Sequence, residues 1–190
     1  MEIDGEQRIA ASTEDVWKAL NDPQALRQCI PGCDSLERIS ENEFDGSVTA
    51  KVGPVKATFG GRVTLSDIDP PNSYTLSGKG QGTAGFAKGE ANVRLRADGG
   101  GTMLSYTAKA QVGGKLAQVG SRLIDGTVRK LAGQFFANLS GHLAADKEAP
   151  AAAPPEVPAT TSGGLSLKIW IVGLIVFAAL LAWVYAAMGN

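Results

Sequence analysis

The segment KVGPVKATFGGRVTLSDIDPPNSYTLSGKGQGTAGFAKGEANVRL, residues 51–95, decides the fold because its apolar residues recur at every second position. This period is typical of β-strands that turn one face toward a core, since successive side chains of a strand point to opposite faces. Turn residues such as Gly-Pro and Pro-Pro-Asn separate the alternating runs. The segment therefore predicts antiparallel strands joined by short turns.

The alternation continues on both sides of this segment. A shorter run lies near residues 36–39, and a longer one follows at 104–112. Together these runs predict about six consecutive strands in an antiparallel meander. Gly60-Gly61 interrupts one run and predicts a bulge or bend that lets the sheet curl.

Helical patterns stand before and after the predicted sheet. Residues 2–11 read as a first strand, after which Ser12 and Asp15 form a capping-box pattern that predicts a helix start. Pro23 suits the first turn of a second short helix.

After the sheet, residues 115–145 keep apolar residues near helical spacing and predict one long helix. Glycines inside a helix cost stability, so those in this stretch predict a close backbone approach or a deliberate gap: Gly120, Gly126 and Gly133.

This order of elements predicts an α+β helix-grip fold, in which the long helix lies across the concave face of a curled sheet and leaves an elongated apolar cavity. The glycines at 78, 80 and 82 share one strand face, against which the helix packs or which lines the cavity. The stretch 83–89 suits a mobile lid, and Tyr106 offers a polar handle. The candidate cavity residues are Gly78, Gly80, Gly82, Phe86, Tyr106, Ala108, Leu123 and Phe135.

The sequence does not favour a nucleotide site, a catalytic site or a metal site. Gly80, Gly82 and Gly85 match G-x-G-x-x-G, but strand patterns on both sides argue against a nucleotide site, which needs a helix start. No set of residues typical of catalysis is recognisable, so we expect no enzyme. Cys29 and Cys33 have no second ligand pair and are expected to be structural rather than metal-bound. A net charge of −1 does not favour nucleic-acid binding.

The C-terminal part has a different composition. A Pro/Ala-rich stretch, 146–167, predicts a linker after a domain at 1–145. The apolar run IWIVGLIVFAALLAWVYAAM at 169–188 carries no charge and predicts a transmembrane helix within an anchor at 168–188. Aromatic residues suited to the headgroup region lie near its ends: Trp170, Trp183 and Tyr185.

The N-terminus lacks an apolar stretch typical of a signal peptide. We therefore expect a single-pass tail anchor in the cytoplasmic (inner) membrane, with the N-terminal domain in the cytoplasm.

Three segments resemble the carbon monoxide dehydrogenase G-subunit family of the SRPBCC (START-like) superfamily: IPGCDSLERI (30–39), KVGPVKATFGGRVTLSDIDPP (51–71) and YTLSGKGQGTAGFAKGEANVRL (74–95). The resemblance covers about residues 1–145. It implies the helix-grip, Bet v 1-like fold and supplies no catalytic residues.

The resemblance also implies a function. It predicts a non-catalytic accessory protein that recruits a cytoplasmic molybdenum hydroxylase, similar to carbon monoxide dehydrogenase, to the membrane. The cavity and the tether favour an alternative, a carrier that passes a quinone or a lipid between the bilayer and the enzyme. No other cofactor is expected.

Overall fold

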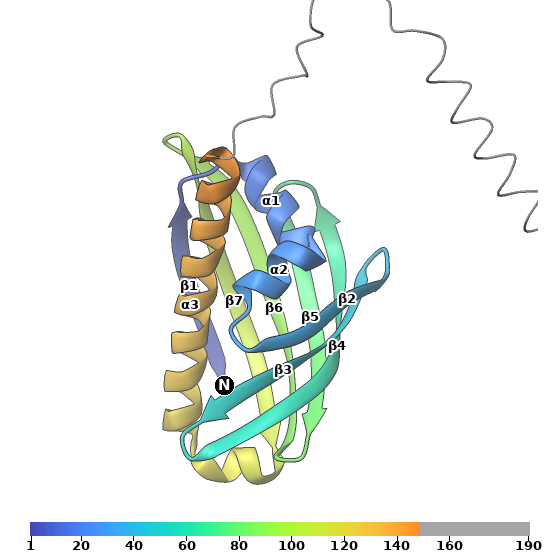
Figure 1. The fold of residues 1–190 in the computed structure, drawn as a ribbon. Coiled ribbons are helices and arrows are strands. Elements are labelled where there is room, and N and C mark those ends of the chain that lie inside the picture. Colours follow the sequence, from blue (N-terminus) through green and yellow to red (C-terminus); the bar gives the residue numbers. More distant parts are fainter. Residues whose placement is uncertain (149–190) are drawn as a thin grey trace, which may run out of the picture. The chain divides into compact units, whose positions relative to one another are not determined.

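The computed structural model describes residues 1–148, which form one seven-stranded antiparallel sheet with helices packed on it (Figure 1). The order of strands in the sheet is β1-β7-β6-β5-β4-β3-β2, so only β1 pairs out of chain order. The strands are β1 (Glu2–Ile9), β2 (Cys33–Ser40), β3 (Glu43–Val52), β4 (Val55–Asp69), β5 (Ser73–Gly82), β6 (Gly85–Asp98) and β7 (Gly101–Gly113). The helices are α1 (Thr13–Asn21), α2 (Pro23–Cys29), the 3₁₀ helix η1 (Gly114–Val119) and α3 (Ser121–Glu148).

The two short helices begin at the residues that the sequence predicts. The Ser12 hydroxyl accepts a hydrogen bond from the Asp15 amide at 3.1 Å, which satisfies one free donor of the first turn of α1. The carboxylate of Asp22 caps α2 in the same way, 2.9 Å from the Gln24 amide, and Pro23 is the first residue of that helix.

Of the bulge or bend predicted at Gly60-Gly61, the bulge is absent. Register is continuous there, with Gly61 opposite Gly46 on β3 and opposite Gly80 on β5. A Cβ atom on Gly61 would lie 2.3 Å from the carbonyl oxygen of Lys79. The glycine therefore permits a close approach of two strands, whereas the irregularity of β4 lies between Ser66 and Asp69.

The predicted single long helix is two helices. Gly120 separates η1 from α3 with φ of +95°, an angle that glycine adopts at little cost and that no α-helix contains. The other two glycines, Gly126 and Gly133, are helical, and a Cβ on either would meet no atom within 4 Å. They therefore mark no close backbone approach, and because both residues are exposed the open space beside them faces solvent.

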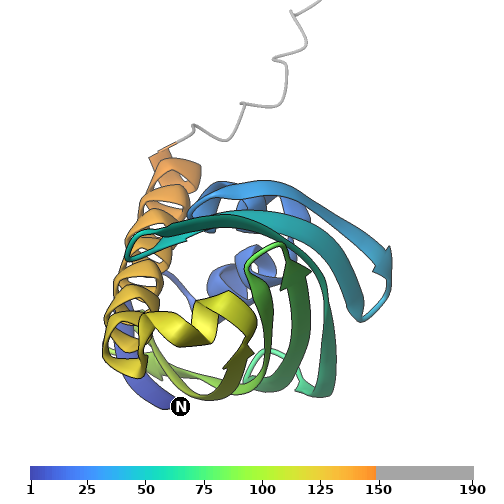
Figure 2. The ribbon, with the colours of Figure 1, turned by 90° about the horizontal axis from the view of Figure 1, so that it is seen from below.

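The core is divided between the two ends of the sheet. The largest cluster joins α1, α2, strands β1, β6 and β7, and the last turns of α3. Ile9, Val16 and Leu139 in this cluster are fully buried. A small cluster of Val52, Leu116 and Ile124 closes the other end. α3 runs along the open side of the curled sheet between these ends, as Figure 2 shows in a view along the curl.

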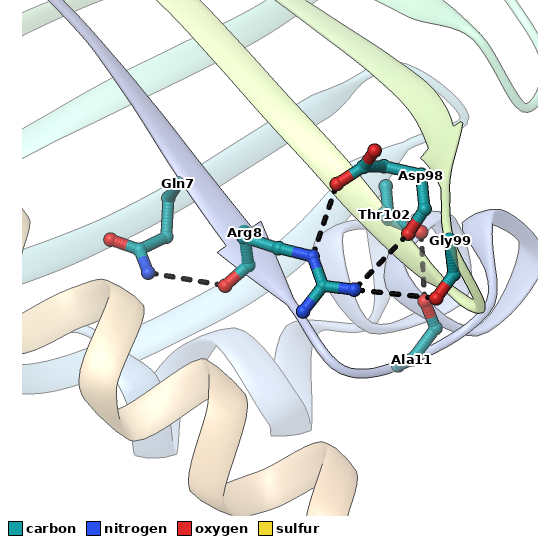
Figure 3. Close-up of polar contacts among 6 residues, drawn as sticks. All are labelled: Gln7, Arg8, Ala11, Asp98, Gly99 and Thr102. Carbon is teal, nitrogen blue, oxygen red and sulfur yellow. Dashed lines mark hydrogen bonds and ion pairs between the residues drawn. The ribbon is translucent and has the colours of Figure 1, made fainter.

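Polar contacts hold the end of β1 against the β6–β7 turn (Figure 3). The Arg8 guanidinium lies 3.0 Å from the Asp98 carboxylate and also donates to the Gly99 carbonyl. Thr102, which is fully buried, donates its hydroxyl to the Ala11 carbonyl at 2.8 Å. These contacts fix the point where the chain leaves the sheet edge and enters α1.

The C-terminal predictions fall largely outside the described residues. α3 continues to Glu148, past the predicted domain boundary at residue 145. The remainder of the predicted linker and the predicted anchor, residues 149–190, lie beyond the part of the chain that the structure describes. Within residues 1–148, no helix is both long and apolar enough to cross a bilayer.

Candidate functional site

An apolar cavity of about 410 Å³ lies between the sheet and α3. Its walls come from α1, α2, the inward faces of β2 to β7, and α3, which contributes Val128, Leu131, Ala132, Phe135 and Phe136. Among the described residues that line it, none carries a charged side chain, and the two tyrosines, Tyr74 and Tyr106, supply the hydroxyl groups. Such a wall favours a neutral, lipophilic ligand.

Three aromatic rings form one side of this cavity. Phe136 contacts Tyr106 and Phe135, with ring centroids 5.5 and 5.3 Å apart. Gly5 on β1 lies opposite Tyr106 in the register, and a Cβ atom there would be 2.6 Å from the tyrosine hydroxyl oxygen. The absence of a side chain at Gly5 therefore lets the Tyr106 ring lie across β1.

A second cavity of about 430 Å³ adjoins the first. The two share lining residues on several strands, among them Leu36, Phe44, Val63, Leu76 and Ala91. The pair is therefore one elongated space, with an apolar aromatic end and an end that we call the small-residue end. The strands that border the small-residue end also carry Arg62, Lys79, Lys88, Glu90 and Lys109.

Large side chains are sparse on the sheet surface of the small-residue end, because glycine and alanine occupy neighbouring inward positions across several strands. Register places Gly46, Gly61, Gly80 and Ala87 in one row. The next row holds Gly78, Gly89 and Ala110. Each of these residues lines the second cavity. The sheet surface is therefore nearly bare backbone there, which leaves room for a ligand between sheet and helix.

Tyr74 anchors the aromatic end. Its ring meets Trp17 edge to face at a centroid distance of 5.5 Å, and the residue is only 6% exposed. Burial raises the pKa of the Tyr74 phenol well above its ordinary value, because the charged form loses hydration in the apolar wall.

This shift predicts a loss of stability at alkaline pH. Below about pH 10 the phenol is neutral in both the folded and the unfolded chain, so its titration leaves stability unchanged. Above that pH the unfolded chain ionises first, and the free energy of unfolding falls by about 1.4 kcal/mol per pH unit. Urea unfolding at rising pH should show a shallower decline for Tyr74→Phe. Equal slopes for the variant and the parent would contradict the expectation, since the lysines titrate in both.

The structure brings some of the predicted site residues together. Gly78, Gly80 and Ala108 line the small-residue end, while Tyr106 and Phe135 line the aromatic end.

The other three predicted residues do not line either of these cavities. Gly82 ends β5, and a Cβ atom on it would lie 2.2 Å from the Thr58 carbonyl oxygen, so its role is strand packing. Phe86 points to the opposite face of the sheet, lies over Gly113 and is 47% exposed. Leu123 is 52% exposed beside the β3–β4 turn. The stretch 83–89 is also no separate lid loop, because β6 already begins at Gly85.

Several lining residues are not among the candidate residues predicted from the sequence. Phe44 begins the alternation of β3, and extending the run at residues 48–52 backward by two positions at a time reaches it. Helical spacing from Val128 leads to Leu131, Ala132 and Phe135, but one helix face alone does not reveal that it borders a cavity.

The remaining candidate motifs do not form sites of their own within residues 1–148. The G-x-G-x-x-G match lies in the β5–β6 hairpin, where no helix begins. Cys29 and Cys33 are free thiols, and burial raises the pKa of both, which keeps them protonated and unreactive. No cluster of His, Cys, Asp and Glu in the described residues could hold a metal ion.

Comparison with solved structures relates this fold to known proteins. A conserved protein from Geobacillus kaustophilus is 33% identical, with a TM-score of 0.73 over 77% of this chain and 97% of that one. The protein Ara h 8.0201 is 16% identical, with a TM-score of 0.56 over 76% and 98% of the two chains.

The Zhui aromatase/cyclase from Streptomyces sp. R1128 is 13% identical, with a TM-score of 0.58 over 80% of this chain and 99% of that one. The two likenesses of low identity show the fold alone, the helix-grip arrangement of SRPBCC and Bet v 1-like proteins. A comparison with curated proteins finds no match.

The family of this chain is identified from its sequence. Residues 5–144 match the family of the carbon monoxide dehydrogenase G subunit (CoxG). This match spans the sheet, both short helices and nearly all of α3, and so this chain belongs to the carbon monoxide dehydrogenase G-subunit (CoxG) family.

Proposed function

We propose that this protein is a non-catalytic accessory protein of a molybdenum hydroxylase-type enzyme and that it holds a lipophilic molecule, a quinone or a lipid, in its cavity. The observation that carries the proposal is the elongated apolar space between the sheet and α3. A carrier of this kind passes its ligand between the bilayer and the enzyme.

The cavity's chemistry supports a lipophilic ligand. A wall that offers two phenol groups and otherwise apolar side chains cannot compensate the desolvation of a charged substrate. The bare backbone of the small-residue end accepts a flat ring or a hydrocarbon chain with few steric constraints. The lining of the aromatic end offers no histidine or carboxylate as a general acid or base, which supports a non-catalytic role.

Family membership supports the partner and a second role, recruitment. The family is described as a subunit of carbon monoxide dehydrogenase, so the partner we propose is a cytoplasmic enzyme of that type. The apolar run at 169–188 supports attachment to the cytoplasmic membrane as a single-pass anchor. Under this proposal the anchor keeps the domain at the bilayer, and the domain recruits the enzyme.

Purification of the full chain from its own cells tests both roles. We would extract it with mild detergent, identify bound proteins by native mass spectrometry, and analyse lipophilic molecules after solvent extraction. The expected result is a stoichiometric quinone or lipid together with a molybdenum-containing enzyme.

The two roles fail separately. An empty protein that still brings down the enzyme would rule out the carrier and leave recruitment. A protein that retains a lipophilic ligand and no enzyme would rule out recruitment. Neither ligand nor enzyme would contradict the whole proposal.

A further inference from the structure

Positive charge is concentrated in three stretches of the chain. Residues 46–66, 70–89 and 99–124 contain no aspartate or glutamate, although the whole chain holds 19 acidic and 18 basic residues. The basic residues near the turns and the helix start in these stretches are Lys51, Lys56, Lys79, Lys88, Lys115 and Arg122.

The fold brings the β3–β4 turn, the β5–β6 turn and η1, one from each stretch, to one end of the domain. The Leu116 amide donates to the Ala84 carbonyl at 2.8 Å, which joins η1 to the β5–β6 turn. A Cβ atom on Gly53 would lie 3.3 Å from Val119, which joins the β3–β4 turn to the end of η1. Figure 2, which looks onto this end, shows η1 in yellow beside the turns. We call the exposed residues of this end the tip surface: Lys51, Pro54, Lys56, Lys115, Arg122 and Leu123.

The cations of the tip surface form no ion pair within residues 1–148. Lys51, Lys56, Lys115 and Arg122 are all exposed. The ion pairs found in this part of the chain involve Arg8, Arg62 and His142 and none of these side chains. These four side chains are therefore not held in ion pairs in this part of the chain and are available to an anionic surface, and Asp125 is the acidic residue that follows them in α3.

Apolar side chains stand among these cations. Leu123 on the first turn of α3 is 52% exposed, and Phe86 on the adjoining hairpin is 47% exposed. Exposed large apolar residues surrounded by unpaired lysine and arginine are typical of surfaces that meet lipid headgroups, where the rings and chains enter the interface and the cations contact phosphate.

We propose that the tip surface docks on a bilayer that contains anionic lipids. The proposal deepens the membrane attachment proposed above and rests on it, since it says which end of the domain faces the lipid. Charge complementarity supports a lipid surface. The uncharged run at 169–188 supports a nearby bilayer but does not select this end, because α3 begins at the tip and ends at Glu148, at the α1 end of the domain (Figure 1). An acidic protein surface is the competing occupant, and the experiment below separates the two.

Docking by the tip surface would place lipid next to the smaller of the two core clusters described above. The buried cluster there contains only Val52, Leu116 and Ile124. Phe59 packs on this cluster and lines the small-residue end, and Val128 packs on it and lines the aromatic end. A tip held against the bilayer therefore has only this small cluster between lipid and cavity.

Vesicle binding by residues 1–148 tests the proposal without the predicted anchor. The match covers 97% of the chain in the Geobacillus kaustophilus crystal structure, so a chain consisting almost entirely of this fold can be crystallised. We would measure co-sedimentation with phosphatidylcholine vesicles, with and without phosphatidylglycerol. Binding should require phosphatidylglycerol and weaken steeply as salt rises, because exposed charges are screened.

Charge reversal locates the contact. Each basic residue near an anionic leaflet changes the partition coefficient roughly fivefold. The tip variant combines four charge reversals: Lys51→Glu, Lys56→Glu, Lys115→Glu and Arg122→Glu. It should lower the partition coefficient by more than about 100-fold. The matched control reverses four exposed cations elsewhere and should bind nearly as well as the parent: Lys18→Glu, Arg94→Glu, Arg96→Glu and Lys130→Glu. Leu123→Ser alone should weaken binding about threefold to tenfold, because the apolar insertion is lost.

Two results would overturn the proposal. Equal loss in the tip variant and the control would show a response to net charge rather than a docking surface. No binding by the parent, together with loss of the co-purified enzyme in the tip variant of the full chain, would show that the tip is a protein interface. The lipophilic ligand is also measured in the full-length tip variant. Ligand retained there supports the carrier function independently of where the domain docks.

Discussion

Gly80→Leu is expected to fold and to lose the lipophilic ligand. A Cβ atom at this position would meet its nearest neighbours at 3.8 Å, an ordinary contact distance, so the backbone has no reason to move. The rest of the leucine side chain would stand in the small-residue end, which has a volume of about 430 Å³. Overpacking costs about 1–3 kcal/mol, so ligand affinity should fall about 5-fold to 150-fold.

The control for this prediction is Gln81→Leu. It places the same side chain one residue further along β5, on the outer face of the sheet, where the residue is exposed. Both variants should unfold cooperatively at temperatures near that of the parent. The measurement is the amount of quinone or lipid extracted per mole of purified full chain. Undiminished ligand in Gly80→Leu would place the ligand elsewhere, and the cavity would then have no part in binding.

Gly61→Ala is expected to be strongly destabilising. Its Cβ atom would lie 2.3 Å from the Lys79 carbonyl oxygen and 2.8 Å from the Cα of Gly80, and both neighbours are backbone atoms of a paired strand. Neither can move without breaking the ladder between β4 and β5. We expect a loss of about 3 kcal/mol in the free energy of unfolding, which is about 6–12 °C in Tm for a domain of this size.

The adjacent glycine provides a sharp control. A Cβ atom on Gly60 would meet nothing within 4 Å, and its φ is not positive, so Gly60→Ala should be neutral or stabilise by about 0.4–1 kcal/mol. Urea unfolding of both variants measures the difference. Similar stabilities for the two would mean that the strands separate easily at Gly61, and the explanation by close strand approach would fail.

Sequence patterns predict much of the fold, because the spacing of apolar residues in a strand or a helix depends only on neighbours along the chain. Alternation reveals the strands, and the Ser12 and Pro23 signals mark the helix starts where the structure has them. These patterns do not predict the helix break at Gly120, because a single glycine inside an apolar stripe does not indicate a positive φ. Within α3 the inward face passes through Ile124, Val128 and Leu131 at helical spacing, and Leu123, one residue before Ile124, therefore lies off that face.

Strand parity explains the error at Phe86. Counting back by two from Ala91 leads to Ala87, so the pattern of β6 itself places Phe86 on the opposite face. Its glycine neighbours suggest a loop, and a loop has no such parity. A shift of one residue moves a strand side chain to the other face of the sheet, so even a well-predicted strand gives a wrong site residue when its start is misplaced.

The amino-acid sequence by itself determined the succession of strands, the family, the two short helices and the small residues at positions 78, 80 and 108, because each depends on neighbours along the chain. Only the tertiary structure decided that Gly46, Gly61 and Gly80 lie in one row and that the lysines of the β3–β4 hairpin and of η1 meet at one end. Those arrangements depend on register between strands and on where the helices close the sheet, and both arise from contacts between residues far apart in the chain.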